Sequence, residues 1–194
     1  MTDALQKLLG SPARIKLLRL FLFNPKQSFT LADLVERSRV QAKDARRETS
    51  LFSDIKLIKR GRKTKRGAAT FVLNNEFEYV AALQALLLNA PTQGNSILKN
   101  IRSTGALKFL VLSGVFMGEW QSSLDILIVG DRINDRKLRE RVRKIESELG
   151  KELRYASLST QDFFYRINMS DHLLRDVLDY PHRIVLDKLN IGLK

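Results

Sequence analysis

The stretch QAKDARRETSLFSDIKLIKRGRKTKRGAATFVL, residues 41–73, decides how the first third of the chain folds. Its first half carries apolar residues at helical spacing, which predicts a helix from Gln41 to Ile55 with one buried face. The inner positions are Ala45, Thr49, Phe52 and Ile55, and the outer positions are Gln41, Lys43, Asp44, Arg46, Arg47 and Ser50. Two further runs, residues 57–63 and 68–73, are joined by Thr64-Lys65-Arg66-Gly67 and predict a β-hairpin with a basic tip.

Helix signals continue on both sides of this stretch. Upstream, the pair Ser11-Pro12 supplies an N-cap and a first helical residue, and Asn24-Pro25 ends the predicted helix. A second, short helix follows with Thr30 as its N-cap. Downstream, residues 75–88 are apolar nearly all round, which predicts a buried helix. That helix could join two domains, form a dimer or pack within the monomer, and residues 90–95 are typical of a linker.

The chain has a formal net charge of +13, and nearly all of it lies before residue 74. Residues 1–73 hold 17 Lys and Arg against 6 Asp and Glu, whereas residues 74–194 hold 17 against 15. Within the first part, residues 56–66 contain seven basic side chains in eleven positions and no acid. A polyanion is the natural partner, because each neutralised phosphate releases counterions and adds affinity. A solvated basic surface without a specific partner is the alternative.

Three helices followed by a two-stranded hairpin, over residues 10–74, resemble the winged helix-turn-helix of bacterial and archaeal transcription regulators. The resemblance implies a third helix that reads the major groove of double-stranded DNA and a hairpin that contacts phosphates or the minor groove. The residues it designates for DNA binding are Gln41, Lys43, Arg46, Arg47 and Ser50 on the helix, and Arg62, Lys63, Lys65 and Arg66 on the hairpin. It also implies a homodimer, because such proteins usually read two half-sites.

Two other roles for the basic domain stay open. A winged helix can serve as a protein-interaction module, although that role does not explain the charge. An RNA-binding or ribosome-associated factor would share the charge argument. Double-stranded DNA is favoured because the narrow major groove of A-form RNA excludes side chains.

Strands and helices alternate from residue 96 onward, which predicts a small α/β domain. The expected strands are 107–112, 124–129 and 152–158, and the expected helices are 96–103, 134–149, 161–167 and 171–178. The helix 134–149 has an amphipathic pattern with Leu138, Val142, Ile145 and Leu149 as its apolar stripe. A second nucleic-acid contact through its arginines is the sharper alternative to a plain surface helix.

The stretch LSGVFMGEWQSSLDILIVGD, residues 112–131, resembles the nucleotidyltransferase signature of the DNA polymerase β superfamily. That family has a Gly-Ser pair after one strand and Ser-Asp-x-Asp at the start of another, where carboxylates hold two Mg²⁺ ions. Here the pair is reversed as Ser113-Gly114, Ser123 replaces the first carboxylate, and Asp125 remains. Arg154 lies near the position of the third carboxylate. The resemblance implies Ser113, Gly114, Ser123 and Asp125 as nucleotide-binding candidates, Asp125 as the catalytic candidate, and no metal site.

Composition excludes several other classes of function. The chain has no cysteine, which removes disulfides, thiolate nucleophiles and Cys-based zinc sites, and its two histidines are too few for a His-rich metal centre. The N-terminus lacks the layout of a signal peptide, and the longest apolar stretches are shorter than the roughly 20 residues that span a bilayer. We therefore expect a cytoplasmic protein without a membrane span.

Together these observations predict an α+β chain with an N-terminal winged helix-turn-helix over residues 1–74. A connecting helix and linker cover 75–95, and an inactive nucleotidyltransferase-like α/β domain covers 96–194. We expect a transcriptional regulator that reads DNA sequence and needs no cofactor, with the second domain used for assembly or nucleotide sensing. The alternative is an active nucleotidyltransferase, which would require Mg²⁺ and would use the basic domain to hold a nucleic-acid or protein substrate. In a stricter alternative, Asp125 merely begins a core strand and Ser113-Gly114 is an ordinary turn.

Overall fold

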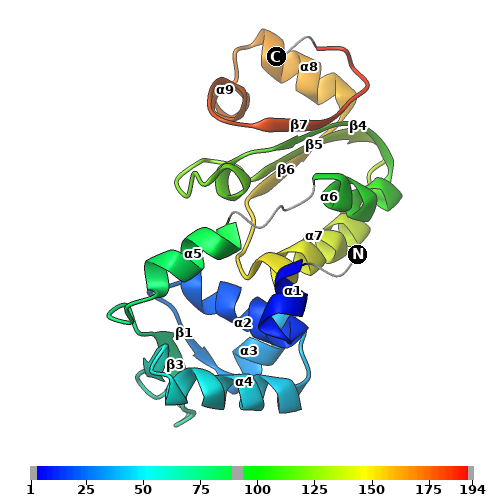
Figure 1. Ribbon diagram of the computed structural model, residues 1–194. Coiled ribbons are helices and arrows are strands. Elements are labelled where there is room, and N and C mark those ends of the chain that lie inside the picture. Colours follow the sequence, from blue (N-terminus) through cyan, green and yellow to red (C-terminus); the bar gives the residue numbers. More distant parts are fainter. Residues whose placement is uncertain (1–3, 89–93, 192–194) are drawn as a thin grey trace. The chain divides into compact units, whose positions relative to one another are not determined.

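The computed structural model describes residues 4–88 and 94–191 and divides the chain into two compact units. Unit 1 consists of residues 1–91 with 144–151, and unit 2 consists of residues 92–143 with 152–194. Each unit combines helices with a sheet of its own (Figure 1). This confirms a mixed α+β fold. The described parts of the chain contain no helix long and apolar enough to cross a membrane.

The helices of unit 1 begin where the sequence supplies caps. They are α1 (Ala4–Leu9), α2 (Pro12–Leu22), α3 (Leu31–Ser38), α4 (Ala42–Asp54) and α5 (Val80–Leu88). The Ser11 hydroxyl accepts a hydrogen bond from the Arg14 amide at 3.3 Å, with Pro12 at the first helical position as predicted. At α3, the Thr30 hydroxyl accepts from the Asp33 amide at 3.2 Å, and the Asp33 carboxylate accepts from the Thr30 amide at 2.7 Å.

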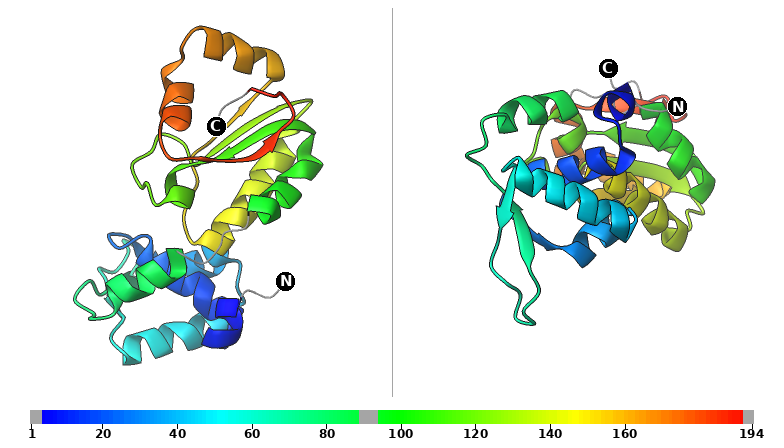
Figure 2. Two further views of the ribbon diagram at one scale, coloured as in Figure 1. Left: turned by 45° about the horizontal axis from the view of Figure 1, so that its top comes forward. Right: turned by 60° about the horizontal axis from the view of Figure 1, so that its bottom comes forward.

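The sheet of unit 1 has three antiparallel strands in the order β1-β3-β2. They are β1 (Ser28–Thr30), β2 (Ile58–Arg60) and β3 (Thr70–Leu73). The hairpin of β2 and β3 is confirmed, with Arg60 opposite Phe71 (Figure 2, right). A hydrogen bond from the Gly67 amide to the Thr64 carbonyl, at 2.8 Å, closes its tip. The regular ladder is shorter than the sequence predicts. Strand β1 was not predicted, because three residues that end in a helix cap form a strand only when β3 lies beside them.

Aromatic side chains join the helices of unit 1 to its sheet. Phe21 of α2 meets Phe29 of β1 and Phe52 of α4 edge to face, with ring centroids 5.7 and 6.4 Å apart. Ala45, Thr49 and Phe52 are buried as predicted. The prediction for Ile55 is wrong: its side chain is 47% exposed because α4 ends at Asp54 and the chain turns away there.

The predicted helix over 75–88 is regular only in α5, and one side of it packs within unit 1. Val80, Leu83 and Leu87 contact the core of this unit. The Gln84 amide group donates to the Leu22 carbonyl at 2.7 Å. The opposite side is exposed, including Leu86. Residues 90–93 of the predicted linker lie outside the described residues, and Gly94 and Asn95 begin the next helix.

Unit 2 has a four-stranded sheet in the order β6-β5-β4-β7. Its strands are β4 (Ala106–Leu112), β5 (Ile126–Asp131), β6 (Tyr155–Leu158) and β7 (Arg183–Asp187), and only the β5–β6 pair is parallel. Strand β7 was not predicted from the sequence. The other elements are α6 (Gly94–Ile101), α7 (Asp135–Leu149), α8 (Thr160–Asn168), α9 (His172–Asp179) and the short 3₁₀ segments η1 (Arg102–Thr104) and η2 (Gly114–Met117). Helices α8 and α9 cover one face of the sheet, and α6 and α7 lie on the other (Figures 1 and 2).

The end of helix α7 belongs to unit 1, whereas the sequence predicts one second domain over 96–194. Within unit 1, the Lys16 ammonium pairs with the Glu148 carboxylate at 2.8 Å. The Asn24 amide group donates to the Gly150 carbonyl at 2.7 Å. A Cβ on Gly150, which has φ +72°, would meet the backbone of residues 19 and 20, so glycine permits this close approach.

Candidate functional site

Helix α4 has a polar outer face, and two neighbouring arginines on it differ in whether they pair with carboxylates. Gln41, Lys43, Arg46, Arg47 and Ser50 are all exposed, as predicted for this face. The Arg47 guanidinium is held by two carboxylates, Asp44 at 3.2 Å and Glu48 at 2.9 Å. Arg46 makes no hydrogen bond or ion pair with any residue in the described part of the chain. The Arg46 guanidinium is therefore available to an external partner, whereas the Arg47 guanidinium is partly occupied by its ion pairs within the helix.

Glu48 anchors this part of α4 from the inside. Its carboxylate is fully buried and accepts from Arg14 Nε at 2.7 Å, in addition to the bonds from Arg47. Burial raises the pKa of Glu48, but the hydrogen bonds from Arg14 and Arg47 outweigh burial and leave this pKa below its ordinary value. The ionised carboxylate thus fixes the side of the helix that faces α2.

The hairpin carries the second group of predicted contacts. Arg62, Lys63, Lys65 and Arg66 are exposed, and none of them forms an ion pair with another described residue. The Thr70 hydroxyl donates to the Arg62 carbonyl at 2.7 Å, which holds the base of the hairpin beyond the regular ladder. A Cβ on Gly61 would approach the Thr70 hydroxyl to 2.6 Å, so the chain packs closely at this point. The basic tip therefore extends from a well-held base.

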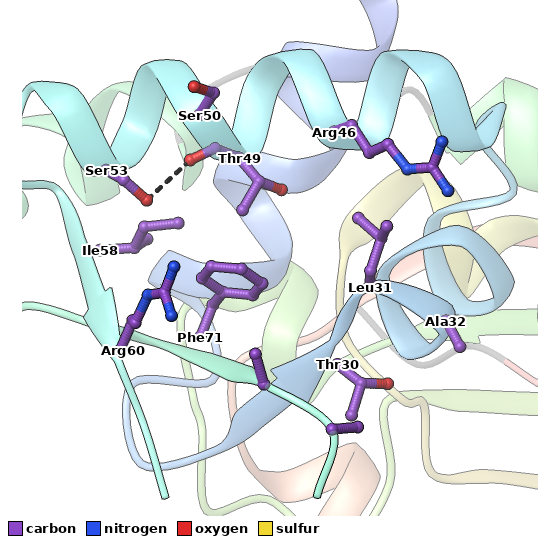
Figure 3. Close-up of a pocket in the computed structure, with 12 residues that line it drawn as sticks. Thr30, Leu31, Ala32, Arg46, Thr49, Ser50, Ser53, Ile58, Arg60 and Phe71 are labelled. Atoms are coloured by element: carbon purple, nitrogen blue, oxygen red, sulfur yellow. Dashed lines mark hydrogen bonds between the residues drawn. The ribbon is translucent and has the colours of Figure 1, made fainter. Parts of the chain in front are cut away.

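A hollow of about 800 Å³ lies between α4, the start of α3 and the sheet, and we call it the α4–hairpin hollow (Figure 3). Its lining is Thr30, Leu31, Ala32, Arg46, Thr49, Ser50, Ser53, Ile58, Arg60, Ala68, Ala69 and Phe71. Arg46 comes from α4 and Arg60 from β2, and both guanidinium groups border the hollow. The helix face and the hairpin base thus share one surface. Arg60 was absent from the predicted DNA contacts, although it lies within the basic run 56–66.

In unit 2, the candidate Asp125 is a fully buried carboxylate with all its described bonds inside the chain. Oδ1 accepts from the Val115 amide at 2.9 Å and from an Arg154 terminal nitrogen at 3.0 Å. Oδ2 accepts from the Arg154 amide at 2.8 Å and from Arg154 Nε at 3.1 Å. The Arg154 guanidinium therefore lies on the carboxylate in a two-point arrangement, and Asp125 joins the turn after β4 to the start of β6.

The other nucleotide-binding candidates are also engaged within unit 2. Ser113 is buried, and its hydroxyl donates to the Leu124 carbonyl at 2.8 Å. Gly114 is buried with φ +52°, and a Cβ there would collide with the Asp125 carboxylate. The Ser123 amide donates to the Asp176 carboxylate at 3.1 Å, and the bonds from Ser123 lower the pKa of Asp176. A nucleotide at this turn would have to displace these bonds, and its binding stays a prediction.

This arrangement determines what the Asp125 cluster can do chemically. A carboxylate that already faces a guanidinium has little free charge left for a metal ion. Among the residues that the structure describes, no three His, Asp or Glu side chains are grouped so that they could hold a metal. Asp125 is therefore suited to holding the loop that contains Ser113 and Gly114.

No protein-family model, curated protein or solved structure matches this chain. Function is therefore inferred from two sites of the chain itself. One is an exposed basic surface in unit 1, with arginines that pair with no residue in the described ranges. The other is a buried, internally satisfied carboxylate in unit 2. The basic surface has the features of a binding site, whereas the buried carboxylate has those of a group that stabilises the fold.

Proposed function

We propose that unit 1 is a winged helix-turn-helix domain that binds double-stranded DNA, and that the protein is a transcriptional regulator. The observation that carries the proposal is the surface shared by α4 and the hairpin. Arg46 and Arg60, unpaired with any described residue, border one hollow there, and the unpaired basic tip of the hairpin continues from it. A helix of this length fits the major groove, and flexible basic residues beside it can reach phosphates.

The order of elements in unit 1 supports this proposal. Helix α2 and strand β1 precede the helix pair α3–α4, and the β2–β3 hairpin follows with β3 in the middle of the sheet. The turn between α3 and α4 is short, and Arg39 within it has φ +49°. The arrangement resembles a helix-turn-helix with one wing. The charge of residues 1–73 gives the surface the electrostatic character that DNA binding requires.

For unit 2 we propose a structural role, in assembly or partner contact. The Asp125 carboxylate accepts hydrogen bonds from the Arg154 side chain and from two backbone amides, and these bonds hold the surrounding loops in place. Nucleotidyl transfer, the alternative function, would require Asp125 to release Arg154 and to act without a second carboxylate at Ser123. Incorporation of labelled nucleotide that is lost in Asp125→Asn would support the alternative instead.

The proposed DNA binding is tested with the full chain and a random duplex DNA library at two salt concentrations, followed by sequencing of the retained duplexes. We expect an enriched motif, and a palindromic motif would support a homodimer. Arg46→Ala should relax the base preference. The double change Lys65→Ala and Arg66→Ala should weaken binding to all sequences and reduce the magnitude of the negative slope of log K against log salt by about 2.

Lys26→Gln provides the matched control, because Lys26 is an exposed cation of unit 1 outside both groups of contacts. It should change neither the motif nor the salt slope appreciably. Equal or tighter binding to double-stranded RNA would contradict the choice of DNA. An absence of salt-sensitive binding to any nucleic acid would overturn the proposal.

A further inference from the structure

We propose that the α4–hairpin hollow binds an organic anion with a flat apolar body, such as an aromatic carboxylate, and that this anion competes with DNA. The binding follows from the hollow alone. The competition rests on the proposed function, because it requires that the same surface contact DNA.

The floor of the hollow is apolar and is formed by three different elements. Leu31 begins α3, Ile58 belongs to β2 and Phe71 belongs to β3. Figure 3 shows these side chains facing the space beneath α4. The hollow, at about 800 Å³, is far larger than a phosphate group. A bound phosphate would therefore leave the apolar floor in contact with water. A flat hydrocarbon body would instead remove apolar surface from water, the main source of affinity in ligand sites of this size.

The polar groups of the hollow specify a negative charge on that body. Arg46 and Arg60 border the hollow, and neither is paired with another residue within the ranges that the structure describes. The described lining contains no Asp or Glu, so no internal carboxylate competes for these guanidinium groups. A guanidinium binds a carboxylate through two parallel N–H donors. The Ser50 hydroxyl provides a further donor at the same border.

The hollow also lies within the surface proposed for DNA. Arg46 and Ser50 of α4 line the hollow and are designated DNA contacts. A carboxylate on Arg46 would neutralise the charge that a phosphate or a guanine needs. The anion and the duplex therefore exclude each other, and the anion would release DNA.

The experiment titrates the full chain with 2-naphthoate, using calorimetry for affinity and two-dimensional NMR for location. Two matched ligands separate the contributions: 2-naphthamide keeps the apolar body without the charge, and inorganic phosphate keeps a charge without the body. We expect 2-naphthoate to bind at least about tenfold more tightly than either. Its NMR shifts should cluster at residues 30–32, 46–53, 58–60 and 68–71. Phosphate binding as tight as that of 2-naphthoate, or shifts elsewhere, would overturn the proposal.

Variants then test the residues that carry the argument. Arg46→Gln and Arg60→Gln should each weaken 2-naphthoate binding about tenfold. Both side chains are exposed and unpaired with any described residue, so we expect these variants to remain folded. Lys26→Gln should leave the affinity unchanged. An unchanged affinity in both arginine variants would refute the proposed site.

A DNA arm separates the two proposals. With a bound duplex, 2-naphthoate should raise the apparent Kd of DNA by the factor 1 + [L]/K, where [L] is the free concentration of 2-naphthoate and K its own dissociation constant. If 2-naphthoate binds in the hollow and DNA does not bind at all, the proposed function fails and the ligand site stands. If both bind and the apparent Kd of DNA does not change, the competition is refuted.

Discussion

The buried Asp125–Arg154 pair leads to a sharp prediction about stability. Asp125→Ala removes the acceptor of two backbone amides, those of Val115 and Arg154, and leaves both without their partner. An unsatisfied buried amide costs about 1–3 kcal/mol. The freed guanidinium adds little, because the Arg154 side chain is 40% exposed and water can solvate it. We therefore expect Asp125→Ala to destabilise unit 2 by about 3–5 kcal/mol.

Two companion variants divide this effect between the charge and the hydrogen bonds. Asp125→Asn keeps one oxygen acceptor but turns an amide group toward a donor, so we expect a loss of about 2–4 kcal/mol. Arg154→Ala leaves a fully buried carboxylate whose donors among the described residues are two backbone amides. Breaking a buried pair costs about 3–5 kcal/mol, and the exposure of Arg154 reduces this to about 2–3 kcal/mol. The double variant should lose about 1–2 kcal/mol less than the sum of the single variants.

The assay is urea unfolding followed by tryptophan fluorescence. Trp120 is the only tryptophan in the chain, and its carbonyl accepts from Arg154 at 3.3 Å, so its signal reports on this part of unit 2. Glu140→Gln is the matched control, because Glu140 is an exposed carboxylate of α7 without a described partner, and it should stay within about 0.5 kcal/mol of wild type. If the stability of Asp125→Asn also stays within that range of wild type, the Asp125 carboxylate does not stabilise the fold. The structural role proposed for this pair in unit 2 is then refuted.

Three more predictions concern single residues. The hydrogen bond from Lys108 helps to lower the pKa of Asp131 from 3.8 to about 2. The negative charge of Asp131 therefore stabilises the fold above about pH 4, and this contribution is lost as the pH falls to about 2. In Asp131→Asn this part of the acid dependence should disappear from a stability series between pH 5 and 2, and an unchanged slope would contradict it. Gly114→Ala should destabilise unit 2 by about 2–4 kcal/mol, because of its φ of +52° and the collision with Asp125; a neutral effect in the same urea assay would mean that the turn rearranges freely. Glu48→Gln should destabilise unit 1 by about 1–3 kcal/mol in urea unfolding followed by circular dichroism, since it removes the buried charge that two arginines share, and unchanged stability would show that these ion pairs contribute nothing.

The sequence predicted best the features that depend on neighbouring residues. The caps at Ser11 and Thr30, and the buried Phe52 face of α4, follow from local rules of backbone geometry and helical spacing. The sequence missed strands β1 and β7, since a short strand is stabilised by a partner distant in the chain. The error at Ile55 has a related cause: its position one residue beyond the helix end depends on where the chain turns.

The candidate sites divide in the same way. The sequence alone determined where the basic residues concentrate, because charge is a property of composition, and it placed Arg46 on the outer face of a helix. Only the tertiary structure decided that Arg47 is held by Glu48 while Arg46 pairs with no described residue, and that Arg60 joins Arg46 at one hollow. It also decided that Arg154 turns onto Asp125. These residues, 29 positions apart, meet only when the sheet forms, because each immediately precedes a strand and the two strands, β5 and β6, pair in parallel.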